Sequence, residues 1–240
     1  MRINMKLKTM AAAVALTFSG IAAAANYTLL TEELPPYSMK LGGKVTGASV
    51  DIVSELFRRS GLSFDVKLQP FVRAVDSTKN DANTCVFPVE RNQEREVSFK
   101  WVSPILVTHT AFYTMNDSKV EIRVLNDAKK LSIGTYTGSA PAEYLSGQGF
   151  EVQTTPKDAP NIQKLAAKRI DVWAADTLTA AYLAKEAKVT NLKERLVYFS
   201  ALRALACNLG TDDSVIDKLE VELKKMYADG SVEKILAKYK

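Results

Sequence analysis

The chain has 240 residues, of which 47% are hydrophobic, and a formal net charge of +5. This length corresponds to one large domain or to two lobes of roughly 100 residues each. The sequence lacks basic runs interleaved with aromatic residues, paired histidines, and the GxSxG, P-loop and dinucleotide motifs. It therefore predicts no nucleic-acid partner, no metal site, no cofactor and no catalytic residue.

Residues 1–25 have the pattern of an export signal. Three basic residues, Arg2, Lys6 and Lys8, precede an apolar run over residues 10–21 and four alanines, Ala22–Ala25. The apolar run is too short to span a membrane. Cleavage after the alanines would remove the three basic residues and reduce the net charge from +5 to +2. Because no cysteine lies near the cleavage position, we expect a periplasmic protein without a lipid anchor.

Strand-like and helix-like segments alternate along the rest of the chain, which is typical of an α/β fold. Apolar periodicity and turn residues predict the first elements: a strand over 27–30, a helix over 50–59, a strand over 64–68, a short helix from residue 70, and strands over 84–89 and 102–113. The remaining elements follow: a strand over 131–135, a helix with Pro141 in its first turn, a helix over 161–168, a strand over 170–174, a helix over 177–187, an extended segment over 196–209, and helices over 214–228 and 231–239.

Two long extended segments, 102–113 and 196–209, are the positions where the chain would cross between two lobes. Lobe 1 is accordingly predicted to comprise residues 26–107 and 200–240, and lobe 2 residues 108–199. The middle lobe would then be an insertion into the first, with two hinge strands.

Two charged residues far apart in the sequence suit the two ends of a small zwitterion. Arg95 lies where a polar turn leads into an extended apolar stretch, and a guanidinium can hold a carboxylate through two parallel hydrogen bonds. Asp176 ends a strand-like segment ahead of a helix, where an acid can face an ammonium group. The alternatives are a salt bridge for Arg95 and a helix N-cap ahead of Leu178 for Asp176.

Several short motifs follow one another along the chain: Pro36-Tyr37, Gly47 with Asp51, Glu94-Arg95 followed by Phe99, Trp101 and Pro104, Gly138-Ser139, Ile170-Asp171 with Asp176, and Asp229-Gly230 with Lys238-Tyr239. Their order and spacing resemble those of the family 3 periplasmic solute-binding proteins. The resemblance covers essentially all of the chain after residue 25. It implies the two-lobe type II periplasmic binding protein fold, an α/β fold in which each lobe is a mixed sheet flanked by helices.

By position, the resemblance implies that Arg95 binds the α-carboxylate of a ligand and that Asp176 receives its α-ammonium. Ser139, at a helix start, would assist the arginine, since the first amides of a helix bind anions readily. Leu34 stands where many members of the family have an aromatic residue over the ligand, so that Tyr37 or Phe71 would do this here.

One stretch departs from the family pattern. Members that bind α-amino acids usually have small hydroxyl residues before the arginine, where this chain has Phe87-Pro88-Val89-Glu90. The proline offers no N–H, and Glu90 adds a charge, which leaves open a cationic, larger or non-standard ligand, or a cleft altered for another purpose. Glu90 is therefore a candidate cleft residue, and Arg73 a candidate second anion contact. The alternative for both is a solvated surface charge.

Cys85 and Cys207 are the only cysteines of the sequence. In an exported protein they can form one disulfide, because disulfides persist outside the cytoplasm. Two buried thiols that pack as small apolar residues are the alternative.

Together these features predict a monomeric binding protein, not an enzyme. It would capture a small polar ligand, an amino acid or a related compound, in a cleft between the lobes and deliver it to an ABC permease. One alternative is a sensory module that reports to a membrane receptor. Another is an enzyme similar to the periplasmic cyclohexadienyl and arogenate dehydratases, with Glu90 as a buried general acid.

Overall fold

The computed structural model describes residues 26–91, 93, 95–137 and 139–239. The predicted export signal, residues 1–25, lies outside this part, as do Glu94 and Gly138 of the family motifs. Among the described residues, no helix is both long and apolar enough to cross a membrane.

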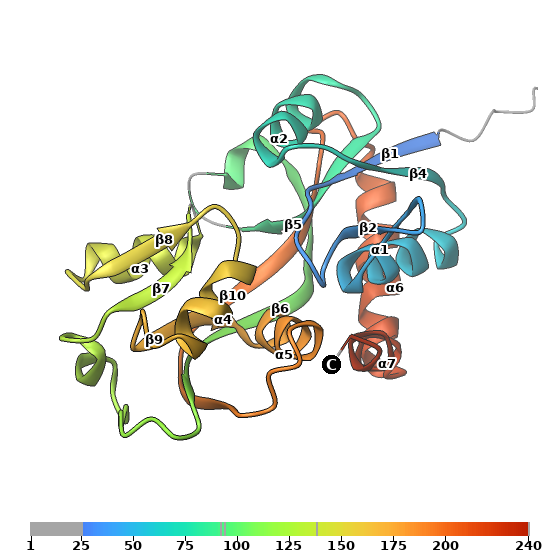
Figure 1. Cartoon of the computed structure of the whole chain (residues 1–240). Helices are drawn as coiled ribbons and strands as arrows, with labels where there is room; N and C mark the ends of the chain where they lie inside the picture. The colour runs from blue at the N-terminus through green and yellow to red at the C-terminus, as the bar shows by residue number, and fades with distance from the viewer. Residues whose placement is uncertain (1–25, 92, 94, 138, 240) are drawn as a thin grey trace, which may run out of the picture.

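Eight strands from all parts of the described chain form one mixed sheet, in the order β4-β1-β5-β10-β6-β9-β7-β8 (Figure 1). Its strands are β1 (Asn26–Thr31), β4 (Ser63–Leu68), β5 (Thr84–Glu90), β6 (Lys100–Met115), β7 (Ile133–Tyr136), β8 (Val152–Thr155), β9 (Val172–Asp176) and β10 (Leu192–Cys207). A short hairpin pairs β2 (Met39–Leu41) with β3 (Lys44–Thr46).

Helices flank both faces of this sheet. They are α1 (Ala48–Arg59), α2 (Phe71–Asn80), α3 (Ala140–Gly147), α4 (Ala159–Ala166), α5 (Thr177–Glu186), α6 (Asp213–Ala228) and α7 (Ser231–Ala237), with the 3₁₀ turns η1 (Glu96–Ser98) and η2 (Leu125–Ala128). The elements predicted from periodicity are all present, most with bounds within a few residues. The short strands β2, β3 and β8 were not predicted, because segments of only three or four residues are too short to show a periodic pattern.

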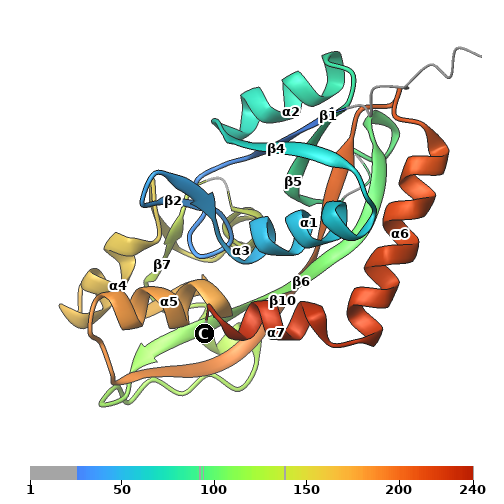
Figure 2. The same cartoon turned by 90° about the vertical axis from the view of Figure 1, so that its right-hand side faces the viewer.

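The long strands β6 and β10 join the two lobes (Figure 2). They are antiparallel and pair from Leu192 opposite Met115 to Cys207 opposite Lys100. One lobe carries β4, β1 and β5 with α1, α2, α6 and α7, and the other carries β9, β7 and β8 with α3, α4 and α5. The predicted fold class is therefore confirmed, with β6 and β10 as the two hinge strands. The predicted lobe boundaries fall close to the facing pair Thr108 and Ala201, and the division there stays a prediction.

Each lobe has its own hydrophobic core on both faces of its part of the sheet. In the first lobe, Phe57 of α1 is fully buried beneath α6, and Trp101 packs on the opposite face beside α2. In the second, Trp173 and Phe112 are fully buried on opposite faces. Burial of such large side chains contributes about 1.5–3 kcal/mol each. Leu178, at the start of α5, packs into the core of the first lobe, so the lobes contact each other beside the hinge.

A disulfide joins Cys85 of β5 to Cys207 of β10, with an S–S distance of 2.07 Å. The two cysteines face each other in the antiparallel pairing of these strands, and both are fully buried. Of the two alternatives that the sequence left open, a bridge or two buried thiols, the structure has the bridge, and it lies entirely within the sheet of the first lobe.

Candidate functional site

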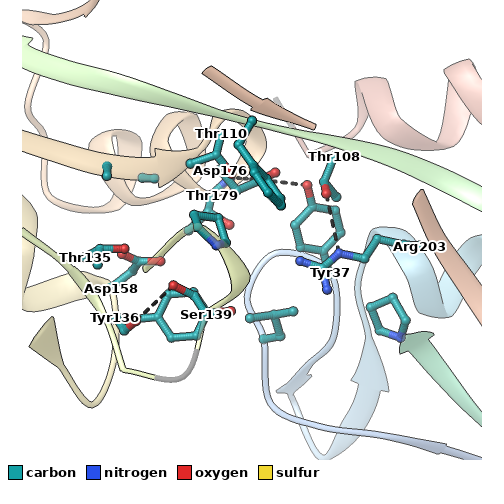
Figure 3. A pocket seen from close by; sticks show the side chains of 16 residues that line it. Tyr37, Thr108, Thr110, Thr135, Tyr136, Ser139, Asp158, Asp176, Thr179 and Arg203 are labelled. Carbon is teal, nitrogen blue, oxygen red and sulfur yellow. Dashed lines mark hydrogen bonds between the residues drawn. The ribbon is translucent and has the colours of Figure 1, made fainter. Parts of the chain in front are cut away.

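A pocket lies between the two lobes, against the hinge strands (Figure 3). The first lobe and the hinge strands contribute Leu34, Tyr37, Pro88, Thr108, Thr110, Phe199 and Arg203 to its lining. The second lobe contributes Thr135, Tyr136, Ser139, Pro141, Asp158, Ala174, Ala175, Asp176 and Thr179.

The pocket is the inner part of a longer cleft. Its volume is about 30 Å³, and one water molecule needs ~10–15 Å³. An outer pocket of about 250 Å³ shares with it Leu34, Tyr136, Asp158 and Thr179. The inner part is therefore nearly closed in this state, and a ligand as large as an amino acid requires the lobes to move apart before it enters.

Asp176 is fixed at the end of β9 as the N-cap of α5. Its Oδ1 accepts hydrogen bonds from the N–H groups of Leu178 and Thr179, both at 3.0 Å, and from the Tyr37 hydroxyl at 2.6 Å. Its Oδ2 is buried and has no hydrogen-bond partner among the described residues. Burial raises the pKa of Asp176, and the hydrogen bond from Tyr37 opposes that shift. The cap and a ligand contact are thus compatible, because they use different oxygens.

Tyr37 reaches Asp176 because the start of α1 holds its backbone. The N–H of Ala48 donates to Pro36 O, and the N–H and hydroxyl of Ser49 both donate to Tyr37 O, at 2.9, 2.9 and 2.7 Å. These contacts satisfy helix amides that otherwise have no partner. Gly47 has φ +135°, and a Cβ there would overlap the carbonyl group of Tyr37. The glycine of the family motif therefore lets the loop lie close to the helix and directs Tyr37 into the cleft.

Asp158 is the second carboxylate of the pocket. It stands at the N-cap position of α4, but its side chain makes no capping hydrogen bond. Its Oδ1 instead accepts from the indole Nε1 of Trp173 at 3.0 Å. Burial raises the pKa of Asp158 to about 6, and the neighbouring charge of Asp176 acts in the same direction.

Arg203 is the cation in the pocket lining. It lies on β10, its side chain is 19% exposed, and its Nη1 is 3.9 Å from Glu90 Oε2. Its Nε donates to Thr108 Oγ1 at 3.4 Å. In Figure 3 it points beneath the ring of Tyr37 into the space between the lobes. Neither Arg203 nor Asp158 is among the site residues predicted from the sequence. One feature of the sequence points to Arg203: it is the only polar residue in the otherwise apolar run Ala201–Ala206.

Ser139 lies in the pocket as the N-cap of α3, as predicted for a helix start. Its Oγ accepts from Ala142 N–H at 3.2 Å and donates to Tyr136 O at 3.0 Å. Pro141 has no N–H, so two of the first amides of α3 are not available to an anion. Ser139 can contact a ligand only by exchanging one of these hydrogen bonds.

The other predicted site residues lie outside the pocket lining. Arg95 is in the turn before η1, where its guanidinium stacks 5.7 Å from the ring of Phe71 and its Nη1 donates to Glu90 O at 3.3 Å. Arg73 is exposed on α2. Glu90 ends β5 and faces Arg203 across the strand pair. The structure thus brings Asp176, Ser139 and Tyr37 together in the pocket, and it places the remaining four on the first lobe outside the pocket lining.

Further contacts across the cleft tie the loop of residues 34–39 to α5. Thr179 Oγ1 donates to Pro35 O at 3.5 Å, and the Tyr182 hydroxyl donates to Met39 Sδ at 3.6 Å. Together with the hydrogen bond from Tyr37 to Asp176, these contacts hold the lobes together on one side of the hinge.

The chain matches the bacterial extracellular solute-binding proteins, family 3, over residues 28–240. It is similar to the probable amino-acid-binding protein YxeM of Bacillus subtilis (strain 168), with 20% identity over 210 residues, which are 85% of this chain and 79% of that protein.

Solved structures share the fold over 89% of this chain. A histidine kinase sensor domain with similarity to periplasmic binding proteins has a TM-score of 0.74 at 19% identity, with 95% of that chain covered. An ancestral arginine-binding protein bound to arginine has a TM-score of 0.71 at 21% identity, with 97% covered. The second substrate-binding domain of a putative amino acid ABC transporter from Streptococcus pneumoniae Canada MDR_19A has a TM-score of 0.72 at 17% identity, with 99% covered. The family match spans nearly the whole chain, and the protein therefore belongs to the bacterial extracellular solute-binding proteins, family 3.

Proposed function

We propose that this protein captures an amino acid or a related zwitterion in the cleft between its lobes. The observation that carries the proposal is the carboxylate of Asp176, whose Oδ1 is held by three hydrogen bonds while its Oδ2 is buried without a partner. A buried carboxylate oxygen without a partner is costly in free energy. An ammonium group of the ligand would supply the missing donors and the missing charge.

The carboxylate of the ligand would face the first lobe. Arg203 lies in the pocket wall beside Thr108, and its guanidinium can hold a carboxylate through two hydrogen bonds. Arg95 matches the arginine of the family motif and lies next to the cleft, over Phe71. Of these two arginines we favour Arg203 as the partner of the ligand carboxylate, because Arg203 lines the pocket in this state and Arg95 does not. A ligand held by the acid of one lobe and the arginine of the other would draw the lobes together by hinge bending.

The expected partner is a membrane protein that recognises the closed form. The relatives named above include a substrate-binding domain of an ABC transporter and a sensor domain of a histidine kinase. We favour delivery to an ABC permease by a monomeric periplasmic protein exported through residues 1–25. Cross-linking in intact cells distinguishes the two partners, because the recovered membrane protein is either a permease or a receptor. In both cases its recovery should depend on the presence of ligand.

The test is a thermal-shift screen of the exported protein, unfolded and refolded to remove carried-over ligand, against amino acids, polyamines and small organic acids. A ligand at 100 times its Kd adds about 2.7 kcal/mol of stability, which corresponds to a rise of ~5–10 °C in Tm for a protein of this size. Asp176→Asn should abolish that rise while keeping the cap, since Asn also caps helices.

The matched control is Asp171→Asn. Asp171 is an exposed acid of the same lobe that binds the N–H of Ser132 and does not line the pocket. Its variant should respond to the ligand as wild type does. A ligand that shifts wild type and Asp176→Asn equally would show that it does not bind in this cleft as proposed.

A further inference from the structure

The cleft is acidic although the chain as a whole has a net charge of +5. The inner pocket is lined by two carboxylates, Asp158 and Asp176, and one guanidinium, Arg203. That guanidinium also lies 3.9 Å from Glu90. The outer pocket adds Glu32, Glu33 and Lys157 to the lining. Four carboxylates thus face two cations in the two linings, and such an excess of negative charge in a cleft raises the local concentration of cationic ligands.

A simple zwitterion leaves one of these acids without a partner. Its ammonium pairs with Asp176 and its carboxylate with an arginine of the first lobe. Asp158 has no salt-bridge partner within 4.0 Å among the described residues, and the charge that acts on it is the like charge of Asp176. A buried acid in that position is neutralised by a proton or by a cation.

The side chain of Asp158 makes no capping hydrogen bond to α4. Its Oδ1 accepts from the indole of Trp173, and the side chain of Asn161 in α4 also stabilises its charged form. Asp158 lines both the inner and the outer pocket. It therefore marks the junction between the place where the ammonium would bind and the wider part of the cleft.

The wall between the two acids suits an aliphatic chain. Leu34, Tyr136 and Thr179 line both pockets together with Asp158. Tyr136 offers a ring face, which packs against methylene groups and attracts cations. A ligand with its ammonium on Asp176 would extend along these residues toward Asp158.

We propose that Asp158 binds a second cationic group of the ligand, so that the cleft selects amino acids with a cationic side chain over neutral ones. The inference rests on the proposed function, because Asp176 and an arginine must first hold the ammonium and the carboxylate. The chemical class is a basic amino acid with either an ammonium or a guanidinium at the end of a short aliphatic chain.

The experiment compares L-arginine with L-citrulline by isothermal titration of the stripped protein at neutral pH. The two compounds have the same shape, but the ureido group of citrulline is uncharged. We expect arginine to bind at least 30-fold more tightly than citrulline to the wild type, and this ratio to fall to a few-fold in Asp158→Asn. L-lysine and L-ornithine, measured alongside, show which cationic group is preferred.

The outcomes separate this inference from the proposed function. If arginine, lysine, citrulline and L-glutamine bind the wild type with similar affinity and Asp176→Asn loses them all, the binding function stands and the role of Asp158 is wrong. If no amino acid binds the wild type, both fail. Since the ratio of arginine to citrulline is measured on the wild type, an Asp158→Asn variant that does not fold still leaves the inference open to contradiction.

Discussion

The two lobes differ in how their charged groups are stabilised. In the first lobe, Arg203 lies beside Glu90 and Thr108, and the strand that carries it is linked to β5 by the disulfide. In the second lobe, Asp158 and Asp176 face the same pocket without a salt bridge among the described residues. The charge of the basic wall of the cleft, Arg203, is therefore paired before a ligand arrives, whereas the acidic wall, Asp158 and Asp176, is held by hydrogen bonds but has no paired cation among the described residues.

This difference indicates where the free-energy cost of the binding site lies. Burial of carboxylates without a cation destabilises a fold, and residues arranged for function commonly lower stability. The second lobe should therefore gain more from the ligand than the first. A ligand that neutralises the acidic wall and also contacts the basic wall would stabilise the second lobe and close the cleft in one step.

Among the changes considered, removal of the disulfide should have the largest effect on the stability of the first lobe. The link closes a loop with a sequence separation of 122 residues, and the chain-entropy argument for loops of about this length gives ~5 kcal/mol. The double variant Cys85→Ala/Cys207→Ala should lose about this much free energy of unfolding in a urea titration. Neither cysteine lines the pocket, so ligand affinity should persist. A loss below about 1 kcal/mol would show that the first lobe does not depend on the link.

The free-energy cost of the buried acids in the second lobe should appear as a pH dependence of the free energy of unfolding. The pKa of Asp158 is raised to about 6 from an ordinary value of 3.8, a difference that corresponds to about 3 kcal/mol at most. A raised carboxyl pKa adds stability that is present at low pH and is lost as the pH rises through 6. The groups that face Asp158 are Trp173, Asn161, Tyr136, Tyr198 and the carboxylate of Asp176.

The measurement is the free energy of unfolding of wild type and Asp158→Asn between pH 4 and pH 8, without ligand. The variant should be the more stable of the two at pH 7.5, by ~1–3 kcal/mol, and the difference should vanish near pH 4. Burial of Asp176, which raises its pKa, is common to both proteins, so the difference reports Asp158 together with its electrostatic coupling to Asp176. A difference that is constant with pH would mean that Asp158 is not buried in its charged form.

The helices, the long strands and the position of Asp176 could be predicted from the sequence, because each depends on residues that are neighbours in the chain. Apolar periodicity gave the helices and the long strands, and Asp176 was found because a strand ends there and a helix begins. The contacts that complete the site join distant segments: Tyr37 and Asp176 are 139 residues apart. Arg203 lies at a β-bulge, where the pairing of β10 with β6 shifts register before Leu205. A bulge changes the direction of side chains, so strict alternation along the strand could not give the orientation of Arg203.

Gly47 offers a way to disturb the first-lobe wall without touching its charges. Its φ of +135° lies in a region nearly confined to glycine, and a Cβ would overlap Tyr37. Gly47→Ala should cost ~2 kcal/mol of stability and weaken ligand binding, since Tyr37 would shift. The control is Gly42→Ala, which also has a positive φ, +56°, but would meet no atom within 4 Å. Equal losses in both variants would indicate that backbone strain alone, and not the overlap with Tyr37, is responsible.

The smallest expected effect is on ligand affinity, and it is measured in two arginine variants. Their comparison decides whether Arg203 or Arg95 binds the carboxylate of the ligand. Arg203→Gln should weaken amino-acid binding about tenfold, or ~1.4 kcal/mol, because its guanidinium lies in the pocket in this state. Arg95→Gln should weaken it less, since that side chain stacks on Phe71 outside the pocket lining. The matched pair is measured by titration with the same ligand, with the unfolding of each variant as the control for folding. If Arg95→Gln has the larger effect, the cleft must rearrange on closure so that the arginine of the family motif replaces Arg203 as the partner of the ligand carboxylate.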